Sequence, residues 1–325
     1  TGSNTGSILQ LFNVALGVLI YIPFIRRSEK RETQDFQQAV RRMSEDMAAG
    51  EKSGSIPLFL SHDYSDNYYA KTLAMDLSNA LRRSQINLFY QPQLTAEEKV
   101  HGVEALLRWK HPVAGYIAPP VIIGLAYESG ILNELSYYLL NRACKDALEI
   151  QKYTEEEIFL SYNISSKQME EEKFFEKVNE IIQSYHLKTV HLVLEVTERA
   201  AMRVSETLSQ DVKILQNYGI QFSLDDFGMG HNSILYLQEG IFSEVKLDGQ
   251  LVSQIQNNER SKEIISGIIQ MAGGLGLRII AEFVETKVQR DLLLALGCEL
   301  YQGYYYSRPL ELSGLKEYIE EGTRH

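Results

Sequence analysis

Residues 221–228 read Gln-Phe-Ser-Leu-Asp-Asp-Phe-Gly, a short apolar run that ends in two adjacent carboxylates. Four other motifs also place a carboxylate or an amide within or at the end of an apolar, strand-like segment. They are Glu104–Arg108 (EALLR), Asn163–Ser165 (NIS), Glu195–Glu198 (EVTE) and Ala281–Glu285 (AEFVE). Carboxylates beside packed apolar segments cost free energy unless something compensates them. Divalent cations that prefer oxygen ligands are a common compensation, so the set indicates a metal-dependent catalyst or a degenerate relative of one.

The segments around these motifs alternate between strand-like and helix-like patterns. The strand candidates are Ile86–Gln91, Gly102–Arg108, Ile158–Asn163, His191–Glu195, Gln221–Asp225, Glu244–Lys246, Arg278–Glu282 and Glu299–Gln302. Helical patterns between them include Leu135–Ile150, Glu171–Tyr185, Thr207–Tyr218, Arg260–Leu275 and Lys287–Leu296. This alternation predicts an α/β fold with a mostly parallel sheet and helical crossovers.

The motif residues lie mainly at the carboxyl ends of the predicted strands. An open doubly wound sheet would also fit the alternation of strands and helices. However, at least six strands contribute polar groups, and a closed (β/α) barrel brings the carboxyl ends of all its strands to one face. We therefore predict a barrel.

Composition limits the class of ligand. A chain of 325 residues with 44% hydrophobic residues is long enough for one large domain and an appendage. A formal charge of −11 argues against broad binding of DNA or RNA, which depends on a basic surface. A small anionic ligand stays open if metal ions neutralise it locally. Cys144 and Cys298 are far apart, and we expect two ordinary buried thiols rather than a zinc site.

The amino terminus differs from the rest of the chain. Residues 8–24 carry no charge and are followed by the basic side chains Arg26, Arg27, Lys30 and Arg31. Such a helix would span about 25 Å, slightly less than a bilayer core of about 30 Å. The trailing basic cluster would keep the following domain in the cytoplasm.

We therefore expect a hydrophobic, membrane-spanning helix within residues 1–27, with an interfacial helix or a non-native remnant as alternatives. The segment LIYIPFIRR at residues 19–27 resembles the last membrane helix of cellobiose-type sugar-phosphotransferase membrane subunits.

Residues 28–72 read as a charged juxtamembrane linker. Within it Phe36, Val40, Met43 and Met47 recur at helical spacing, which indicates an amphipathic helix and a candidate dimer seam. A solvated, charged linker explains the composition equally well. The segment GEKSGS at residues 50–55 indicates a flexible break, and we place the main domain at residues 73–325.

The motif residues suit phosphoryl chemistry. Glu104, Asn163, Glu195 and Asp225 offer the oxygen ligands that Mg²⁺ or Mn²⁺ prefers, and Asp226 could help to hold a second ion. Two such ions can activate a water and stabilise an in-line displacement at phosphorus. Any one of these carboxylates, taken alone, is more often a helix cap or an ion-pair partner.

Three further residues have candidate roles in this chemistry. Lys246 could orient the attacking water, and Glu282 could act as a general base or as a metal ligand. Arg108 is suited to a guanine edge or a phosphate.

The ordered set of motifs resembles the EAL-domain family of cyclic di-GMP phosphodiesterases, over residues 73–315. The resemblance extends to Tyr90–Pro92 (YQP), Gly102–Trp109 (GVEALLRW), Leu194–Glu198 (LEVTE), Leu224–Gly228 (LDDFG), Lys246–Asp248 (KLD), Ile280–Glu282 (IAE), Gln302–Tyr304 (QGY) and Ser307–Pro309 (SRP). It implies a modified (β/α)₈ barrel, TIM-like in form, that hydrolyses cyclic di-GMP to linear pGpG. This activity would lower the level of the second messenger in bacterial signalling, and a homodimer at the inner membrane is expected.

The resemblance also implies roles for individual residues. Glu104, Asn163, Glu195 and Asp225 would hold the first Mg²⁺ or Mn²⁺, and Asp225, Asp226 and Glu282 the second. Lys246 and Glu282 would position and deprotonate the water. Substrate contacts would come from Arg108, Gln91 and Gln302, and Glu198 would steady the loop after the aspartate pair.

Two departures from the family pattern leave an alternative open. Met229, His231 and Asn232 stand where the family has Thr, Tyr and Ser, and Phe283 replaces a usual glycine. The alternative is a catalytically inactive module that binds cyclic di-GMP as a sensor. Every predicted metal-ligand position is intact, which favours the enzyme.

Overall fold

The computed structural model describes residues 29–50, 57–169, 171–201, 206–228, 237–238 and 240–322. The described residues fall into two compact units. Unit 1 contains residues up to Ile86 and Arg108–Ile131, and unit 2 contains Asn87–Leu107 and the residues from Leu132 onward. The apolar segment at residues 8–24, most of the predicted break at residues 50–55 and the loop at residues 229–232 lie outside the described ranges.

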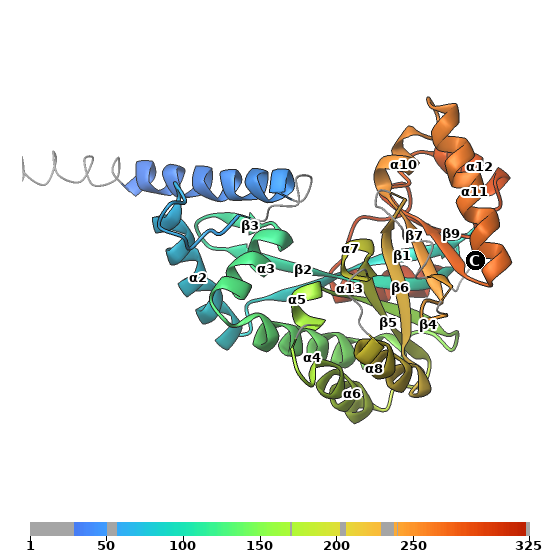
Figure 1. Cartoon of the computed structure of the whole chain (residues 1–325), viewed down its shortest axis with the longest axis horizontal. Helices are drawn as coiled ribbons and strands as arrows, with labels where there is room; N and C mark the ends of the chain where they lie inside the picture. The colour runs from blue at the N-terminus through green and yellow to red at the C-terminus, as the bar shows by residue number, and fades with distance from the viewer. Residues whose placement is uncertain are drawn as a thin grey trace, which may run out of the picture. The chain divides into compact units, whose positions relative to one another are not determined.

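Unit 2 is built on a closed ring of strands (Figure 1). In ring order the strands are β1 (Asn87–Thr95), β9 (Leu300–Gln302), β8 (Arg278–Ala281), β7 (Glu244–Leu247), β6 (Gln221–Phe227), β5 (Val190–Thr197), β4 (Ile158–Ile164) and β2 (Val100–His111). An additional pairing between β1 and β2 closes the ring. The barrel prediction is confirmed, and each of the eight predicted strands overlaps an observed one.

The barrel departs from the regular (β/α)₈ pattern at one strand. Neighbouring strands from β2 through β9 pair in parallel, whereas β1 pairs with β9 antiparallel, with Gln93 opposite Gln302. The last residues of β2 belong to unit 1, where they form an antiparallel hairpin with β3 (Gly115–Ile117). The sequence analysis did not identify the three-residue β3.

Helices connect the parallel strands. In unit 2 they are α4 (Leu132–Ile150), α5 (Ser166–Met169), α6 (Phe174–Tyr185), α7 (Glu198–Ala201), α8 (Glu206–Asn217), α10 (Gly249–Gln254), α11 (Glu259–Leu275), α12 (Lys287–Ala295) and α13 (Leu312–Gly322). The five predicted helices correspond to α4, α6, α8, α11 and α12, with their ends displaced by at most three residues.

The ends of two helices follow directly from local chemistry. The Asn258 side chain accepts hydrogen bonds from the first backbone N–H groups of α11, and Gly276 ends that helix in the left-handed region at φ 71°. Thr286 and Gln289 form a reciprocal capping box at the start of α12. These signals set the lengths of the crossovers that follow β7 and β8.

Side-chain alternation separates the barrel interior from the surrounding helices. In β6, Phe222 and Leu224 are buried, and they alternate with Gln221, Ser223 and Asp225. Because successive side chains of a strand point to opposite faces, the polar set shares one face of the sheet. The polar face leads to the carboxyl end of β6, where the two aspartates stand.

Unit 1 contains a helix over residues 29–50, α2 (Asn67–Arg82) and α3 (Pro119–Glu128). Phe36, Val40, Met43 and Met47 are all buried, so the amphipathic helix is confirmed. The alternative of a solvated linker is wrong for residues 29–50. The apolar face considered as a dimer seam is buried within the single chain and is not available to a second copy.

Several contacts hold this helix to the rest of unit 1, among them a ring stack and an ion pair. The ring of Phe36 stacks on Tyr69 with 5.7 Å between centroids. The Arg42 guanidinium Nε lies 2.7 Å from a carboxylate oxygen of Asp66, the residue before α2. The sequence analysis did not identify α2, which begins at Asn67, ahead of the predicted domain start at residue 73.

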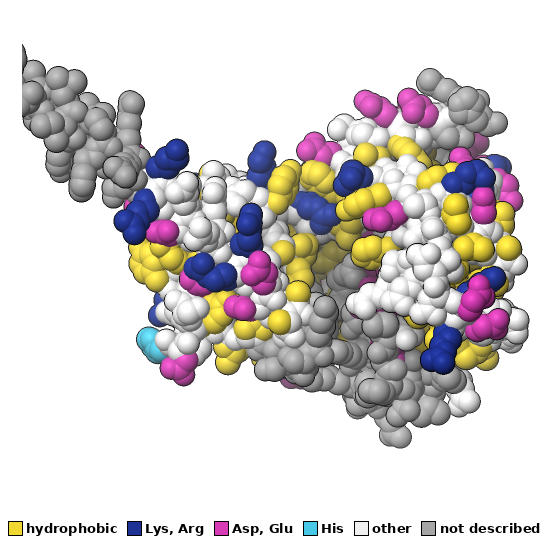
Figure 2. All heavy atoms as spheres, turned by 90° about the horizontal axis from the view of Figure 1, so that it is seen from above, with side chains coloured by type: hydrophobic (Ala, Val, Ile, Leu, Met, Phe, Trp, Pro, Cys, Tyr) yellow, Lys and Arg dark blue, Asp and Glu magenta, His cyan; other side chains and the backbone are white. Residues whose placement is uncertain are grey.

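The surface carries charges of both signs. Figure 2 shows one face of the chain, on which basic and acidic side chains are interspersed with apolar ones. Within the described ranges, no helix combines the length and the apolar character needed to cross a membrane.

The burial of the helix over residues 29–50 makes a stability prediction. Met43→Ala should lower the free energy of unfolding by about 2–5 kcal/mol, because it removes a fully buried side chain and leaves a cavity. Chemical denaturation followed by circular dichroism would measure the loss. Glu45→Ala, an exposed substitution on the same helix, is the control. Equal unfolding midpoints for both variants would contradict the packing described.

Candidate active site

Nine of the predicted site residues gather at the carboxyl end of the barrel in unit 2. Each of seven strands contributes: Gln91 from β1, Glu104 from β2, Asn163 from β4, Glu195 from β5, Asp225 and Asp226 from β6, Lys246 from β7 and Gln302 from β9, with Glu282 directly after β8. Parallel strands in a ring direct their carboxyl ends to one face, so residues far apart in sequence meet there.

Lys246 is the centre of this group. Its ammonium Nζ lies 2.8 Å from Glu282 Oε1, 3.1 Å from Glu195 Oε2, 3.3 Å from Glu104 Oε2 and 3.5 Å from Asp225 Oδ1. The Lys246 side chain is fully buried. Four negative charges therefore face one positive charge in a region from which water is largely excluded.

Amide side chains hold Glu104 in place. Asn163 Nδ2 donates a 2.8 Å hydrogen bond to Glu104 Oε1, and Gln302 Nε2 donates a 2.6 Å hydrogen bond to Glu104 Oε2. The Gln302 amide also donates to Gln91 Oε1 and accepts from Gln93 Nε2. Gln93 was missed in the sequence, although its position two residues after Gln91 on the same strand places both side chains on one face.

The excess of negative charge changes the protonation of the carboxylates. Burial, together with the neighbouring Glu104 charge, raises the pKa of Glu195 well above its ordinary value. Burial also raises the pKa of Glu282 to about 8, even though Lys246 opposes the shift. For Glu104, burial works in the same direction, but the Lys246 charge and the amide hydrogen bonds outweigh it and lower the pKa.

For Lys246, burial and the neighbouring charges act on the pKa in opposite directions. Burial alone would lower its pKa, but the surrounding carboxylates, Asp225 and Glu104 first, raise it well above the ordinary value. The ammonium therefore stays charged at neutral pH. One ammonium does not balance the four carboxylates, so the group has affinity for protons or for further cations.

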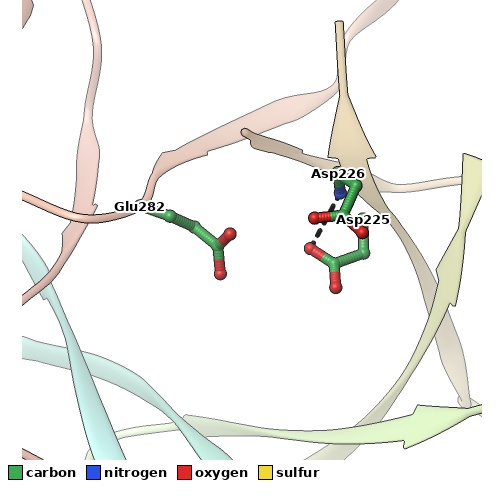
Figure 3. A group of neighbouring side chains, drawn as sticks. All are labelled: Asp225, Asp226 and Glu282. Atoms are coloured by element: carbon green, nitrogen blue, oxygen red, sulfur yellow. Dashed lines mark hydrogen bonds between the residues drawn. The ribbon is translucent and has the colours of Figure 1, made fainter. Parts of the chain in front are cut away.

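A second feature is the cluster of Asp225, Asp226 and Glu282. Each offers one carboxylate oxygen, and these oxygens all lie within 4.8 Å of one another. Figure 3 shows Glu282 directed toward the aspartate pair at the end of β6. Adjacent residues of a regular strand point to opposite faces, but Asp226 adopts the left-handed region at φ 58°. This local turn lets two consecutive carboxylates serve one cluster.

The donor set fits a hard divalent cation. Glu195 Oε1 is buried and receives no hydrogen bond from the described residues. An unpaired buried oxygen beside clustered carboxylates is a favourable ligand for Mg²⁺ or Mn²⁺, which prefer oxygen donors. The residues that could hold such ions are Glu104, Asn163, Glu195, Asp225, Asp226 and Glu282.

The predicted roles of two further residues stay predictions. Arg108 belongs to unit 1, so its predicted contact with substrate stays a prediction. Glu198 is buried at the start of α7, but the loop that it was predicted to steady lies at residues 229–232, outside the described ranges. The left-handed conformations of Asp226 and Phe283 had no signal in the sequence.

The chain is similar to known proteins over the barrel. Residues 74–309 match the EAL domain family. The chain is 36% identical over 245 residues to the cyclic di-GMP phosphodiesterase NbdA of Pseudomonas aeruginosa, covering 75% of this chain and 31% of NbdA. It is 34% identical over 239 residues to MucR of the same organism, a bifunctional diguanylate cyclase/cyclic di-GMP phosphodiesterase, covering 73% of this chain and 35% of MucR.

A solved structure supports the same relation. The PaMucR phosphodiesterase in its c-di-GMP complex is similar with a TM-score of 0.70 at 33% identity, covering 75% of this chain and 99% of that chain. By contrast, this chain spans only about a third of the length of the two curated relatives. The similarity therefore concerns the barrel and not their remaining parts.

The position of Lys246 makes a prediction about stability. In the presence of chelator, Lys246→Met should lower the free energy of unfolding by about 3–5 kcal/mol, because four buried carboxylates lose their common partner. Added Mg²⁺ should recover part of the loss. Lys287→Met, which removes an exposed ion pair with Asp291, should have no measurable effect.

The stability of the Lys246→Met variant should depend strongly on pH. With its pKa raised from 4.5 to about 8, Glu282 retains a proton in the folded chain that the unfolded chain has released, so stability falls as pH rises through this interval. Lys246→Met should steepen that fall. The decrease in the free energy of unfolding that the substitution causes should therefore be smaller at pH 5 than at pH 8. A pH-independent loss, measured by denaturation across this range, would contradict the assigned electrostatics.

Proposed function

Because the chain belongs to the EAL domain family, we propose that it hydrolyses cyclic di-GMP to linear pGpG with Mg²⁺ or Mn²⁺ as cofactor. The observation that carries the proposal is the meeting of four carboxylates, from or directly after four strands, around the buried Lys246. The names of the relatives NbdA and MucR, and the c-di-GMP complex of the related structure, support this choice of substrate.

The metal ligands are assigned from the donor set. Glu104, Asn163, Glu195 and Asp225 would hold one ion, and Asp225, Asp226 and Glu282 a second. When bound, the ions would supply positive charge that offsets the phosphodiester charge and stabilises the attacking and leaving oxygens. The hydrogen bonds from Asn163 and Gln302 support the assignment of Glu104, because they fix the orientation of its carboxylate.

The proton is handled by the chain itself. The water oxygen would form a bond to phosphorus while the bond from phosphorus to the 3′ oxygen breaks. Glu282 would accept the water proton, and the released 3′ oxygen would take a proton from solvent to give the 3′-hydroxyl of pGpG. A carboxylate whose pKa lies near neutrality suits a general base, and burial gives Glu282 that property. Lys246, 2.8 Å from Glu282 Oε1, would orient the water and steady the base.

Other assignments complete the proposal. Arg108, Gln91 and Gln302 would contact the substrate, and Glu198 would steady the loop after Asp226. We propose the phosphodiesterase domain at residues 73–325, whereas residues 29–50, predicted as part of a charged linker, form a packed helix of unit 1. The homodimer implied by the family resemblance stays a prediction.

The activity is tested with purified full-length chain, cyclic di-GMP and Mn²⁺, with the products separated by chromatography. We expect pGpG from the unmodified chain and none with chelator. Glu104→Gln should lower turnover by about 100-fold or more, because it replaces a metal-ligating carboxylate by an amide. Glu263→Gln, an exposed substitution on α11, is the matched control.

The outcomes distinguish an active phosphodiesterase from an inactive module that binds cyclic di-GMP. Undiminished turnover by Glu104→Gln would contradict the site assignment. Tight binding of cyclic di-GMP by the unmodified chain without product would favour the inactive sensor.

We further propose that the apolar segment at residues 8–24 anchors the chain in the inner membrane, with the domain on the cytoplasmic side. The pair Leu16→Asp and Val18→Asp should move the chain from the membrane pellet to the supernatant, since each aspartate near the helix centre costs about 3 kcal/mol on insertion. Leu16→Val is the control. An unmodified chain found only in the supernatant would refute the anchor.

A further inference from the structure

Phe283 has two unusual properties. Its backbone adopts the left-handed conformation at φ 54°, which residues other than glycine rarely adopt. Its side chain is also 62% exposed, which is high for a large aromatic residue. The residue directly follows Glu282 in the sequence. Strained backbone of this kind recurs where a protein contacts ligands, because the conformation is kept for its function.

The ring of Phe283 packs against Gly249. Three of its atoms, Cγ, Cδ2 and Cε2, lie within 2.8 Å of the point where a Cβ of residue 249 would stand. Only glycine leaves room for the ring there, so Gly249 and Phe283 form a matched pair. One part of the ring packs on Gly249 and the rest faces solvent, which gives an exposed aromatic surface at a fixed position.

That position borders the acidic cluster. Gly249 begins α10 directly after β7, and β7 lies between β6 and β8 in the ring. The aspartate pair stands at the end of β6 and Glu282 follows β8, facing it (Figure 3). The same turn of α10 also approaches the residue after β6, because Leu251 Cδ1 lies 2.6 Å from the point where a Cβ of Gly228 would stand.

We propose that Phe283 contacts a guanine base of the bound substrate and so contributes to the affinity for cyclic di-GMP. The inference rests on the proposed phosphodiesterase activity and adds a substrate-contacting residue to it. Aromatic side chains at fixed positions bind bases by stacking, and such a ring beside the acidic cluster lies within one nucleotide of a phosphodiester held there. Phe283 therefore contributes affinity for the substrate, and its bulk extends the site instead of obstructing it.

Binding is measured by calorimetry on the full chain, with Ca²⁺ in place of Mg²⁺ so that the looser coordination supports binding without turnover. Phe283→Leu should weaken the affinity for cyclic di-GMP by about tenfold, the size of one lost stacking contact. Phe283→Tyr should remain within about twofold of the unmodified chain, because the ring is kept. Under turnover conditions Phe283→Leu should raise KM and change kcat little.

A spectroscopic variant tests the contact directly. Phe283→Trp should show fluorescence that is quenched when cyclic di-GMP is added, against the constant signal of the buried Trp109. Tyr218→Trp places an equally exposed indole before β6, at the opposite end of the strand from Asp225, and should show no quenching.

Three other outcomes would overturn the proposed contact between Phe283 and the substrate. Equal affinities of Phe283→Leu and the unmodified chain would overturn the contact and leave the phosphodiesterase intact. So would a shift from dimer to monomer in sedimentation with unchanged affinity, which would assign Phe283 to a second copy. No binding and no hydrolysis by the unmodified chain would overturn the proposed function together with the inference.

The substitution Phe283→Gly distinguishes a binding role of the Phe283 ring from a packing role. Phe283→Gly should bind cyclic di-GMP as weakly as Phe283→Leu while its melting temperature is unchanged or higher, because glycine adopts φ 54° without strain. A large fall in melting temperature would instead assign the ring a packing role and overturn the proposal.

Discussion

The buried ammonium of Lys246 compensates four carboxylates that come from or directly follow four different strands, and the carboxyl face of the barrel is organised around it. Without such a partner the carboxylates would repel one another in a region that excludes water. The compensation is incomplete, because four charges face one. This shortfall gives the face affinity for divalent cations. Burial, with a smaller contribution from the neighbouring carboxylates, raises the pKa of Glu282 to about 8.

The fold could be read from the sequence to a large extent, and the reasons are local. Each barrel strand is an apolar run ended by a polar residue or a turn, so all eight were found. The helices α11 and α12 carry clear capping residues at Asn258 and Thr286, which set their ends within one residue of prediction. In contrast, β3 is only three residues long and had no usable periodic signal. The helix α2 carries apolar residues at helical spacing, including Leu73, Leu77 and Leu81, but it was missed because it lies ahead of the recognisable motifs.

The gathering of the candidate ligands could be predicted from the sequence, but their geometry could not. Carboxylates at strand ends identify the candidate ligands, because a ring brings those ends together. The sequence does not reveal that Asp226 leaves the strand conformation, nor that Phe283 rests on Gly249. Both depend on contacts between segments that only the closed barrel brings together. The predicted substrate contact of Arg108, which belongs to the other compact unit, stays a prediction.

The antiparallel strand β1 has a consequence for the order in which the chain matures during synthesis. Its partner β9 ends at Gln302, so the first strand made waits for the last before the ring can close. Gln302 also supplies a hydrogen bond to Glu104, 198 residues earlier. Contacts of such long range form late in folding. A nascent chain on the ribosome therefore carries an open, acidic barrel, and it acquires the complete carboxylate face only after Gln302 has been translated.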